Sequence, residues 1–406
     1  MREAAAHADS PNTPVLHPPR QPAHIITTEQ EALTIAEQLA ERLHVHAALR
    51  DSQRQLPWAE LDEIAASGLL ALRVPKQWGG VGVSNLNLTR IIATISAADA
   101  SIGQLFLSIV LACGLIESAA TDAQKRLFFG KILEGYRWGN GHAEGGPMPA
   151  GTTQTRITRV GDHYRVDGAK AYSTGALFSH LISIGCVNED GEARTAVIDR
   201  YAPGLTILDD WDGFGQRTTA SGTLLLDNVK VQASHVIDSE KGRLASNTYA
   251  IPDLFHSALD LGIAKAAFSD TLHYVREHAR PFARTGVNRI EDDPYVLQII
   301  GDVRTRIVAG EAVLERAASL FDRVTAAGGE GRSEEVSAAL AEAKILTTEA
   351  ALLASNKLFQ LGGASSTRLI HGYDRHWRNA RTHTVHDPVA WKFHLIGSFQ
   401  LKQAGG

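Results

Sequence analysis

Residues 371–397 read HGYDRHWRNARTHTVHDPVAWKFHLIG and follow a run of long helical patterns. Pro388 has a fixed φ and no backbone N–H, so it suits the first position of a helix. Asp387 is disfavoured in the α region because it precedes proline, and it suits the N-cap. We therefore expect a helix to begin at Pro388, with His383 and His386 on the turn before it. Free N–H groups and the positive end of the helix dipole would face this turn, which predicts a place for chemistry on an anion or an oxygen atom.

Two simpler interpretations of this histidine pair stay open. The first is that the histidines only cap the helices on either side. The second is zinc binding by His383 and His386, but a catalytic zinc site needs a third protein ligand and usually a glutamate base. Asp387 is the nearest candidate ligand, and its expected capping role competes. We therefore predict no metal site.

The composition is that of an ordinary globular protein. The chain has 406 residues, of which 44% are hydrophobic and 21% charged, enough for two or three domains. A net charge of −5 gives no reason to expect nucleic acid or an anionic membrane as partner. Cys113 and Cys186 form neither a disulfide framework nor a CxxC motif, which fits a reducing cytoplasm. Since no run of eighteen apolar residues occurs, we expect no membrane span and a cytoplasmic location.

The hydrophobic period divides the chain into helix, sheet and helix. Residues 1–24 lack any period and predict a mobile N-terminal arm. Residues 25–137 predict a helical domain that opens with a capping box at Thr28 and Glu31. Further helices are expected over 58–72, over 86–120 as one or two helices, and over 122–134.

Residues 138–245 change to a period of two and predict a β domain. The segment 155–168 reads as a hairpin with Gly161 and Asp162 in its turn. Further short strands follow without helices between them, at least six in all, so we expect a small antiparallel barrel or sandwich.

Residues 246–406 return to the helical period. Long helices are expected over 250–279, 294–326 and 333–360, the last ending at Gly362 and Gly363. Together with the helix from Pro388 they predict a four-helix bundle.

This α+β order resembles the acyl-CoA dehydrogenase fold, with an N-terminal all-α domain, a middle β domain and a C-terminal four-helix bundle. PKQWGGVG (75–82) and DGAKAYSTGALFSHLISI (167–184) resemble motifs of that family. The resemblance is closer to its flavin-dependent monooxygenase branch, which includes dibenzothiophene monooxygenases and sulfur-acquisition oxidoreductases. The stretches that carry it are WGNG (138–141), AKAYSTGA (169–176), DDWDGFGQRTTASGT (209–223), ARPF (279–282) and RHWRNARTHTVHDPVAWK (375–392).

The resemblance gives the turn before Pro388 a specific meaning. Dehydrogenases of this fold commonly carry a Tyr-Glu-Gly-Thr step here, whose glutamate removes the substrate α-proton. This chain has Val385-His386-Asp387-Pro388 instead, and an imidazole both accepts and donates protons near neutral pH. The helix dipole contributes only ~0.3–1 kcal/mol, which leaves His386 mostly neutral at pH 7. The resemblance implies that His386 is catalytic, together with His383 and Thr174.

The flavin contacts are likewise implied by the resemblance. Thr174 corresponds to a hydroxyl near the reactive edge of the flavin, and Arg280 to a phosphate-binding arginine from a neighbouring subunit. Without the resemblance, Arg280 would be a solvated charge at a helix end. The implied cofactor-binding residues are Asn140, Ser173, Thr174, Trp211, Arg280, Gly362 and Gly363.

Two further residues bear on the substrate. Gln104 and Ser108 align with a histidine and a tyrosine that some monooxygenases of the branch place near the substrate. Their smaller, more polar side chains favour a small organosulfur compound over a polycyclic aromatic one.

The resulting hypothesis is a two-component monooxygenase that oxidises a small organosulfur compound with O2 in sulfur acquisition. An NAD(P)H-dependent flavin reductase would supply the reduced FMN, and a homotetramer is expected. The first alternative is an acyl-CoA dehydrogenase or oxidase with bound FAD. The second is a non-catalytic flavin-binding scaffold.

Overall fold

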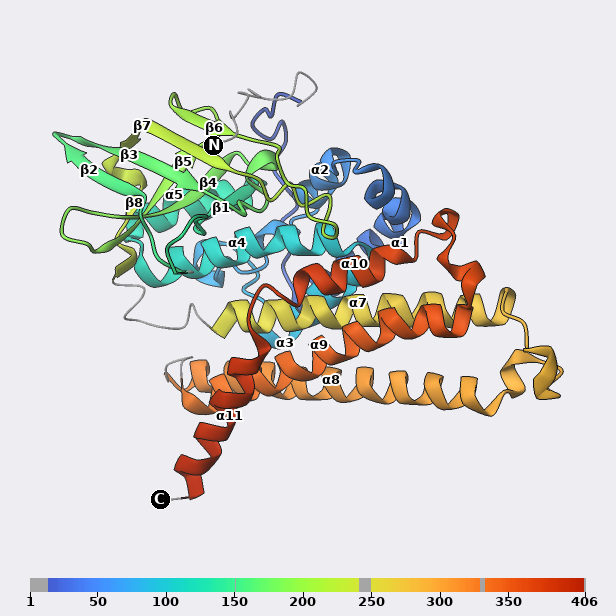
Figure 1. Cartoon of the computed structure of the whole chain (residues 1–406). Coiled ribbons are helices and arrows are strands. Elements are labelled where there is room, and N and C mark those ends of the chain that lie inside the picture. The colour runs from blue at the N-terminus through green and yellow to red at the C-terminus, as the bar shows by residue number, and fades with distance from the viewer. Residues whose placement is uncertain (1–13, 150, 241–249, 329–332, 405–406) are drawn as a thin grey trace.

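The computed structural model describes residues 14–149, 151–240, 250–328 and 333–404. Helices, an eight-stranded sheet and a second set of helices follow each other along the chain (Figure 1). The predicted order of helix, sheet and helix is therefore confirmed. Of the arm predicted over 1–24, residues 1–13 lie outside the described residues. Residues 14–24 form no helix or strand, and Tyr201 and His180 of the β domain hydrogen-bond to their backbone.

The N-terminal region is helical. Its helices are α1 (Glu29–Gln53), α2 (Trp58–Ala66), α3 (Asn85–Ala98), α4 (Ala100–Ala119) and α5 (Asp122–Leu133). Thr28 caps α1 by accepting the backbone N–H of Glu31 at 3.1 Å, as the sequence predicts. The Glu31 carboxylate accepts from Thr27 rather than completing the reciprocal box.

The helix predicted over 58–72 is too long. The structure ends α2 at Ala66, and a short 3-10 turn follows at Leu69–Ala71. Gly68 between them has φ +83°, and a Cβ there would lie 2.1 Å from the carbonyl oxygen of His24. Because this conformation and this close approach both require glycine, the chain turns sharply where the apolar pattern alone continues.

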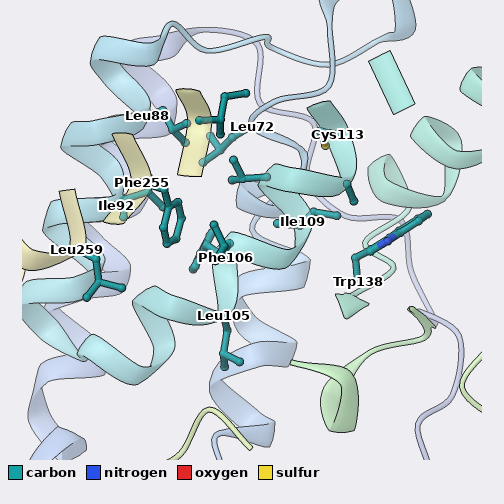
Figure 2. Packing of buried hydrophobic residues seen from close by; sticks show 14 of the residues in the cluster. Leu72, Leu88, Ile92, Leu105, Phe106, Ile109, Cys113, Trp138, Phe255 and Leu259 are labelled. Atoms are coloured by element: carbon teal, nitrogen blue, oxygen red, sulfur yellow. The ribbon is translucent and has the colours of Figure 1, made fainter. Parts of the chain in front are cut away.

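Helix α4 lies between the sheet and the long C-terminal helices (Figure 1). It is long and apolar enough to cross a membrane, but 78% of its most apolar window is buried inside the protein. Phe106 and Ile109 of α4 pack with Phe255 of α7 (Ala250–Glu277) and Trp138 of β1 (Trp138–Gly141) in one continuous core (Figure 2). α4 is therefore the central helix of the core, which joins all three regions.

The middle region is one mixed sheet. Beside β1 its strands are β2 (Arg156–Val160), β3 (His163–Lys170), β4 (Leu181–Val187), β5 (Ala193–Asp199), β6 (Leu205–Ile207), β7 (Leu224–Gln232) and β8 (Val236–Ile237). The order is β6-β7-β3-β2-β4-β5-β8, with β1 beside β4. The predicted hairpin of β2 and β3 is present. The sheet is not purely antiparallel, because β1 and β2 both pair with β4 in parallel.

The C-terminal helices form the second helical region. They are α7, α8 (Pro294–Ala326), α9 (Glu334–Gly362), α10 (Asp374–His383) and α11 (Val389–Ala404). α9 packs against α7, α8 and α11, and α3 packs against α7. Within one chain none of the residues of α11 is buried. The fourth bundle helix is therefore covered far less than the other three.

The junction of α10 and α11 differs from the prediction in two details. α11 begins at Val389, one residue after Pro388. His383 is the last residue of α10 rather than part of the turn, and its side chain is buried. His386 does lie on the turn. The ion pair between Asp387 and Lys392, at 2.7 Å, engages the carboxylate that was predicted to be the N-cap.

Candidate active site

Three histidines meet where α10 ends against α7. His383 Nε2 lies 2.8 Å from Nδ1 of His256, and His383 Nδ1 lies 2.5 Å from Oδ1 of Asp260. His256 and Asp260 are one turn apart on α7, so both face α10. The rings of His256 and His386 are in contact, with centroids 4.4 Å apart. The two histidines predicted from the sequence thus belong to a larger cluster, in which His256, His383 and Asp260 are buried and His386 is exposed.

A buried ion pair supports this cluster from the opposite side. Lys344 of α9 donates to Oδ2 of Asp260 at 2.6 Å, and Thr348 donates to the same oxygen at 2.8 Å. Lys344 and Asp260 are 1% and 0% exposed, so the pair is shielded from solvent. Burial alone would raise the pKa of Asp260, but Lys344 and His383 hold it well below its ordinary value. The carboxylate therefore stays ionised and accepts all three hydrogen bonds.

The histidines of the cluster are neutral near pH 7. Burial lowers the pKa of His256 well below its ordinary value, and His383 and His386 add to the effect. Burial also lowers the pKa of His383, against the opposing influence of Asp260. Although part of its side chain is exposed, His386 has a pKa lowered to about 4, first by desolvation and then by His383 and Lys344. The neutral state expected for His386 is thus produced by its surroundings more than by a helix dipole.

The predicted flavin-contacting residues of the β domain gather at the loop after β3. Ser108 of α4 donates to the carbonyl oxygen of Thr174 at 2.9 Å, and the backbone N–H of Asn140 donates to the same oxygen at 3.2 Å. The Thr174 hydroxyl lies 2.8 Å from that of Ser221. Ser108 and Asn140 also line a cavity of about 400 Å³ between α4 and the sheet.

Several polar side-chain atoms of the described residues are buried without a hydrogen-bond partner. Neither Ser173 Oγ nor Gln104 Oε1 has a hydrogen-bond partner among the described residues. A buried polar atom without a partner costs about 1–3 kcal/mol, so these atoms fit a site that is completed by a bound polar molecule. This is the arrangement expected of residues that hold a cofactor or substrate.

The backbone around these residues is strained. Tyr172, Gln216 and Ala220 have φ values of 53°, 53° and 45°, which L-residues rarely adopt. Such conformations cost of order 1–3 kcal/mol each and concentrate at functional sites. Trp211 joins this segment, since its indole N–H donates to the carbonyl oxygen of Gln216 at 2.9 Å. The ring of Trp211 lies edge-on to that of Tyr172.

Hydrogen bonds connect the loop that holds Trp211 to α10, and one of them is donated by Nη1 of Arg378 to the carbonyl oxygen of Phe214 at 2.8 Å. The side-chain oxygen of Asn379 accepts the backbone N–H of Gln216 at 2.7 Å. Asn379 precedes His383 by one turn of α10 and is buried. The loop that holds Trp211 and the helix that holds His383 are therefore fixed to each other.

The remaining predicted cofactor residues lie elsewhere. Arg280, Gly362 and Gly363 line a separate cavity of about 790 Å³ at the junction of α7 and α9. Arg280 lies beyond the C-terminal end of α7, whereas His256 is near its beginning. At 1.5 Å per residue the helix separates them by roughly 30 Å. Within one chain Arg280 does not reach the histidine cluster.

The prediction from the sequence did not include three residues of this site, His256, Asp260 and Lys344. Asp260 and Lys344 are the charged residues of two otherwise apolar helical segments, ALDLGIA (258–264) and AKIL (343–346). A charge on the buried face of a helix needs a partner, so this signal was available. His256 gives no such signal, because its partner is 127 residues away. Both ring nitrogens of His383 are engaged in hydrogen bonds, which argues against the zinc interpretation.

Known families and structures match this architecture. The family model "Acyl-CoA dehydrogenase, N-terminal domain" matches residues 27–136, and "Acyl-CoA dehydrogenase, C-terminal domain" matches residues 254–391. The fold and the residues gathered within it therefore define a protein of the acyl-CoA dehydrogenase class.

The individual matches are more specific. Dibenzothiophene monooxygenase of Rhodococcus qingshengii is 31% identical, over 92% of this chain and 94% of its own length. The probable FMNH2-dependent monooxygenase SfnC of Pseudomonas putida is 30% identical, over 96% of this chain and 97% of its own length. FMN-bound TdsC from Paenibacillus sp. A11-2 superposes with a TM-score of 0.85 at 30% identity, over 92% and 97%. Methanesulfinate monooxygenase MsuC from Pseudomonas fluorescens gives 0.84 at 30% identity, over 91% and 97%. The chain belongs to the flavin monooxygenase branch of the acyl-CoA dehydrogenase family.

Proposed function

We propose that this protein is the oxygenase of a two-component system that oxidises a small organosulfur compound. Reduced FMN, supplied by an NAD(P)H-dependent flavin reductase, provides two electrons and two protons and activates O2 when bound. One oxygen atom forms a bond to sulfur and the other leaves as water, while FMN is released oxidised. The protein contributes binding, orientation and proton handling, as is usual for cofactor enzymes.

The observation that carries the proposal is the chemistry of the turn between α10 and α11. An acyl-CoA dehydrogenase needs a free carboxylate base, but Asp387 is paired with Lys392 and Asp260 is fully buried by three hydrogen-bond donors. The turn instead presents the neutral imidazole of His386. A neutral imidazole suits proton exchange with oxygen atoms better than abstraction of a substrate α-proton without help.

The described residues fit FMN as the cofactor. The relatives SfnC, named as FMNH2-dependent, and TdsC, solved with FMN bound, also support FMN as the cofactor of this chain. Among the described residues, Ser173, next to Thr174, and Gln104, one turn before Ser108 on α4, have buried polar atoms without hydrogen-bond partners. Trp211, on the loop between β6 and β7, offers an aromatic surface beside Tyr172. We assign these residues to flavin and substrate contacts, with His386 and Thr174 as catalytic residues and His383 as the buried residue of the predicted set that supports His386.

Gln104 and Ser108 favour a small substrate. Both are buried on α4, and Ser108 lines the cavity that also contains Asn140. A carboxamide and a hydroxyl leave a polar wall suited to sulfinate or sulfone oxygens rather than a polycyclic ring. The relative MsuC is named for methanesulfinate, which is consistent with this size.

The test is oxygen transfer with a generic flavin reductase, NADH, FMN and ¹⁸O2, against a panel of sulfides, sulfones and sulfonates. We expect product that carries one ¹⁸O atom, only when reductase and FMN are both present. Retained FAD with reduction of an electron acceptor by an acyl-CoA thioester would instead identify a dehydrogenase. No turnover with any reductant and acceptor would identify a flavin-binding scaffold.

A homotetramer is the expected assembly. α11 has no buried residue, and its Trp391, Phe393 and Leu401 side chains are 67%, 55% and 78% exposed. An apolar helix of this kind is typical of a closed, symmetric interface. Light scattering coupled to size exclusion should give four times the mass of the chain. A stable monomer that binds FMN normally would contradict this prediction.

Arg280→Ala should weaken FMN binding by roughly 1.5–3 kcal/mol, the range for hydrogen bonds to charged groups. Arg280 has no ion-pair partner among the described residues, so its guanidinium is available to a phosphate of the flavin bound by a neighbouring chain. Titration of FMN by fluorescence quenching measures the change. Arg284→Ala is the matched control, since Arg284 is exposed nearby but does not line the cavity. Equal effects of both variants would remove Arg280 from the site.

A further inference from the structure

The buried Asp260 carboxylate fixes the protonation of the histidine cluster. As an ionised carboxylate it only accepts hydrogen bonds, so His383 must carry its proton on Nδ1. The Nε2 of neutral His383 is then an acceptor and receives the Nδ1 proton of His256. The Nε2 of neutral His256 carries no proton and is therefore also an acceptor. Both histidines are thereby held in the Nδ1–H tautomer.

The charges around the histidines leave room for one additional proton. Lys344 faces them from α9 and Lys392 from α11, against the carboxylates of Asp253, Asp260 and Asp387. Two positive and three negative groups give the surroundings one net negative charge. One proton on the histidines would therefore neutralise the cluster. Burial nevertheless disfavours a resident imidazolium, so a proton taken up would be held briefly and returned.

We propose that His256, His383 and Asp260 form a proton relay behind His386, with His256 Nε2 as its entry. A proton that binds to His256 Nε2 is matched by transfer of the Nδ1 proton of His256 to Nε2 of His383. The resulting imidazolium of His383 is paired with Asp260, and the reverse transfers return the proton. No heavy-atom bond changes, and no oxidant or reductant is consumed.

The role of the relay rests on the proposed function, in which two protons end in water while oxygen passes to sulfur. His386 contacts the His256 ring and is the partly exposed member of the cluster. In this arrangement His256 and His383 are positioning and proton-holding residues that act together with His386. His256 was not assigned any role from the sequence.

The tautomers can be measured without flavin. ¹⁵N-histidine NMR of the flavin-free protein at pH 7.5 should show Nδ1–H tautomers at two positions, assigned by loss of their signals in His256→Gln and His383→Gln. Thr348→Val is the control, because it removes a donor to Asp260 but leaves the hydrogen bonds between Asp260 and His383 and between His383 and His256 unchanged. An Nε2–H tautomer at either position would overturn the relay, whether or not the protein proves to be a monooxygenase.

Asp260→Asn should reverse the direction of the hydrogen bonds between residue 260, His383 and His256. Lys344 and Thr348 are donors, so they would hold the amide oxygen, and the amide nitrogen would donate to Nδ1 of His383. Both histidines would then carry their protons on Nε2. A similar carboxylate-to-amide change at a serine-protease triad lowers kcat ~10⁴-fold through the wrong tautomer. We expect reversed tautomers with a large loss of product; unchanged tautomers in a folded variant would contradict the proposal.

A second variant covers the case in which Asp260→Asn does not fold. In His256→Ala, product formation should fall at least tenfold and recover several-fold with added imidazole. 1-Methylimidazole fills the same space but cannot both donate to His383 and accept a proton, so it should not restore activity. Equal rescue by the two compounds, or full activity without either, would reduce His256 to a packing role.

Discussion

His386→Ala should lower the yield of oxygenated product by ~10²–10⁴-fold, the usual contribution of general acid–base catalysis. Oxygen would still be consumed with reduced FMN, but it would be released as hydrogen peroxide. His386 lies on a turn and is partly exposed, so its truncation should leave little cavity and change thermal stability and FMN affinity only slightly. Measuring product and peroxide in the same reaction tests both parts of this prediction.

His46→Ala is the matched control for that experiment. His46 is an exposed histidine on α1, away from the cluster, and its loss should change neither product nor peroxide. A capping role for His386 predicts the opposite pattern, with lower thermal stability and preserved coupling between oxygen use and product. Preserved coupling in His386→Ala would therefore exclude its catalytic role.

Lys344→Met should lower the free energy of unfolding by about 3–5 kcal/mol, the range for removing one partner of a buried ion pair. The carboxylate of Asp260 would remain in a fully buried place with Thr348 and His383 as its only donors. Because Lys344 also lowers the pKa of His256, His383 and His386, their pKa values should rise in the variant. Chemical denaturation and histidine NMR titration measure the two effects.

Lys265→Met is the control for this second prediction. Lys265 pairs with Glu311 between α7 and α8, but about a third of each side chain is exposed. An exposed pair contributes about 0–1 kcal/mol, so this variant should be nearly as stable as the parent. Similar losses in both variants would mean that burial of the Lys344–Asp260 pair has no special energetic role.

Much of the fold could be predicted because local patterns decide it. The apolar stripe of α8, the Thr28 cap and the hairpin turn at Gly161 are each readable within a few residues of sequence. The end of α2 could not be predicted in this way. It depends on Gly68 meeting the backbone of His24, which is a contact between distant segments.

The candidate site was predictable only where residues are neighbours in sequence. His383 and His386 are three positions apart, and the motif around them could be recognised as a unit. Asp260 joins them across 123 residues and Lys344 joins Asp260 across 84. A period shows which helix face is buried, but it does not show which charges meet between two buried faces.

The length of α7 has a consequence for inheritance. If one flavin needs the histidines of one chain and Arg280 of another, two differently damaged chains can compensate for each other. A cell that makes both an Arg280 variant and a His386 variant would assemble some sites with neither defect. Alleles that are each inactive alone would then restore partial growth on the sulfur source when combined, which two copies of the same allele cannot do.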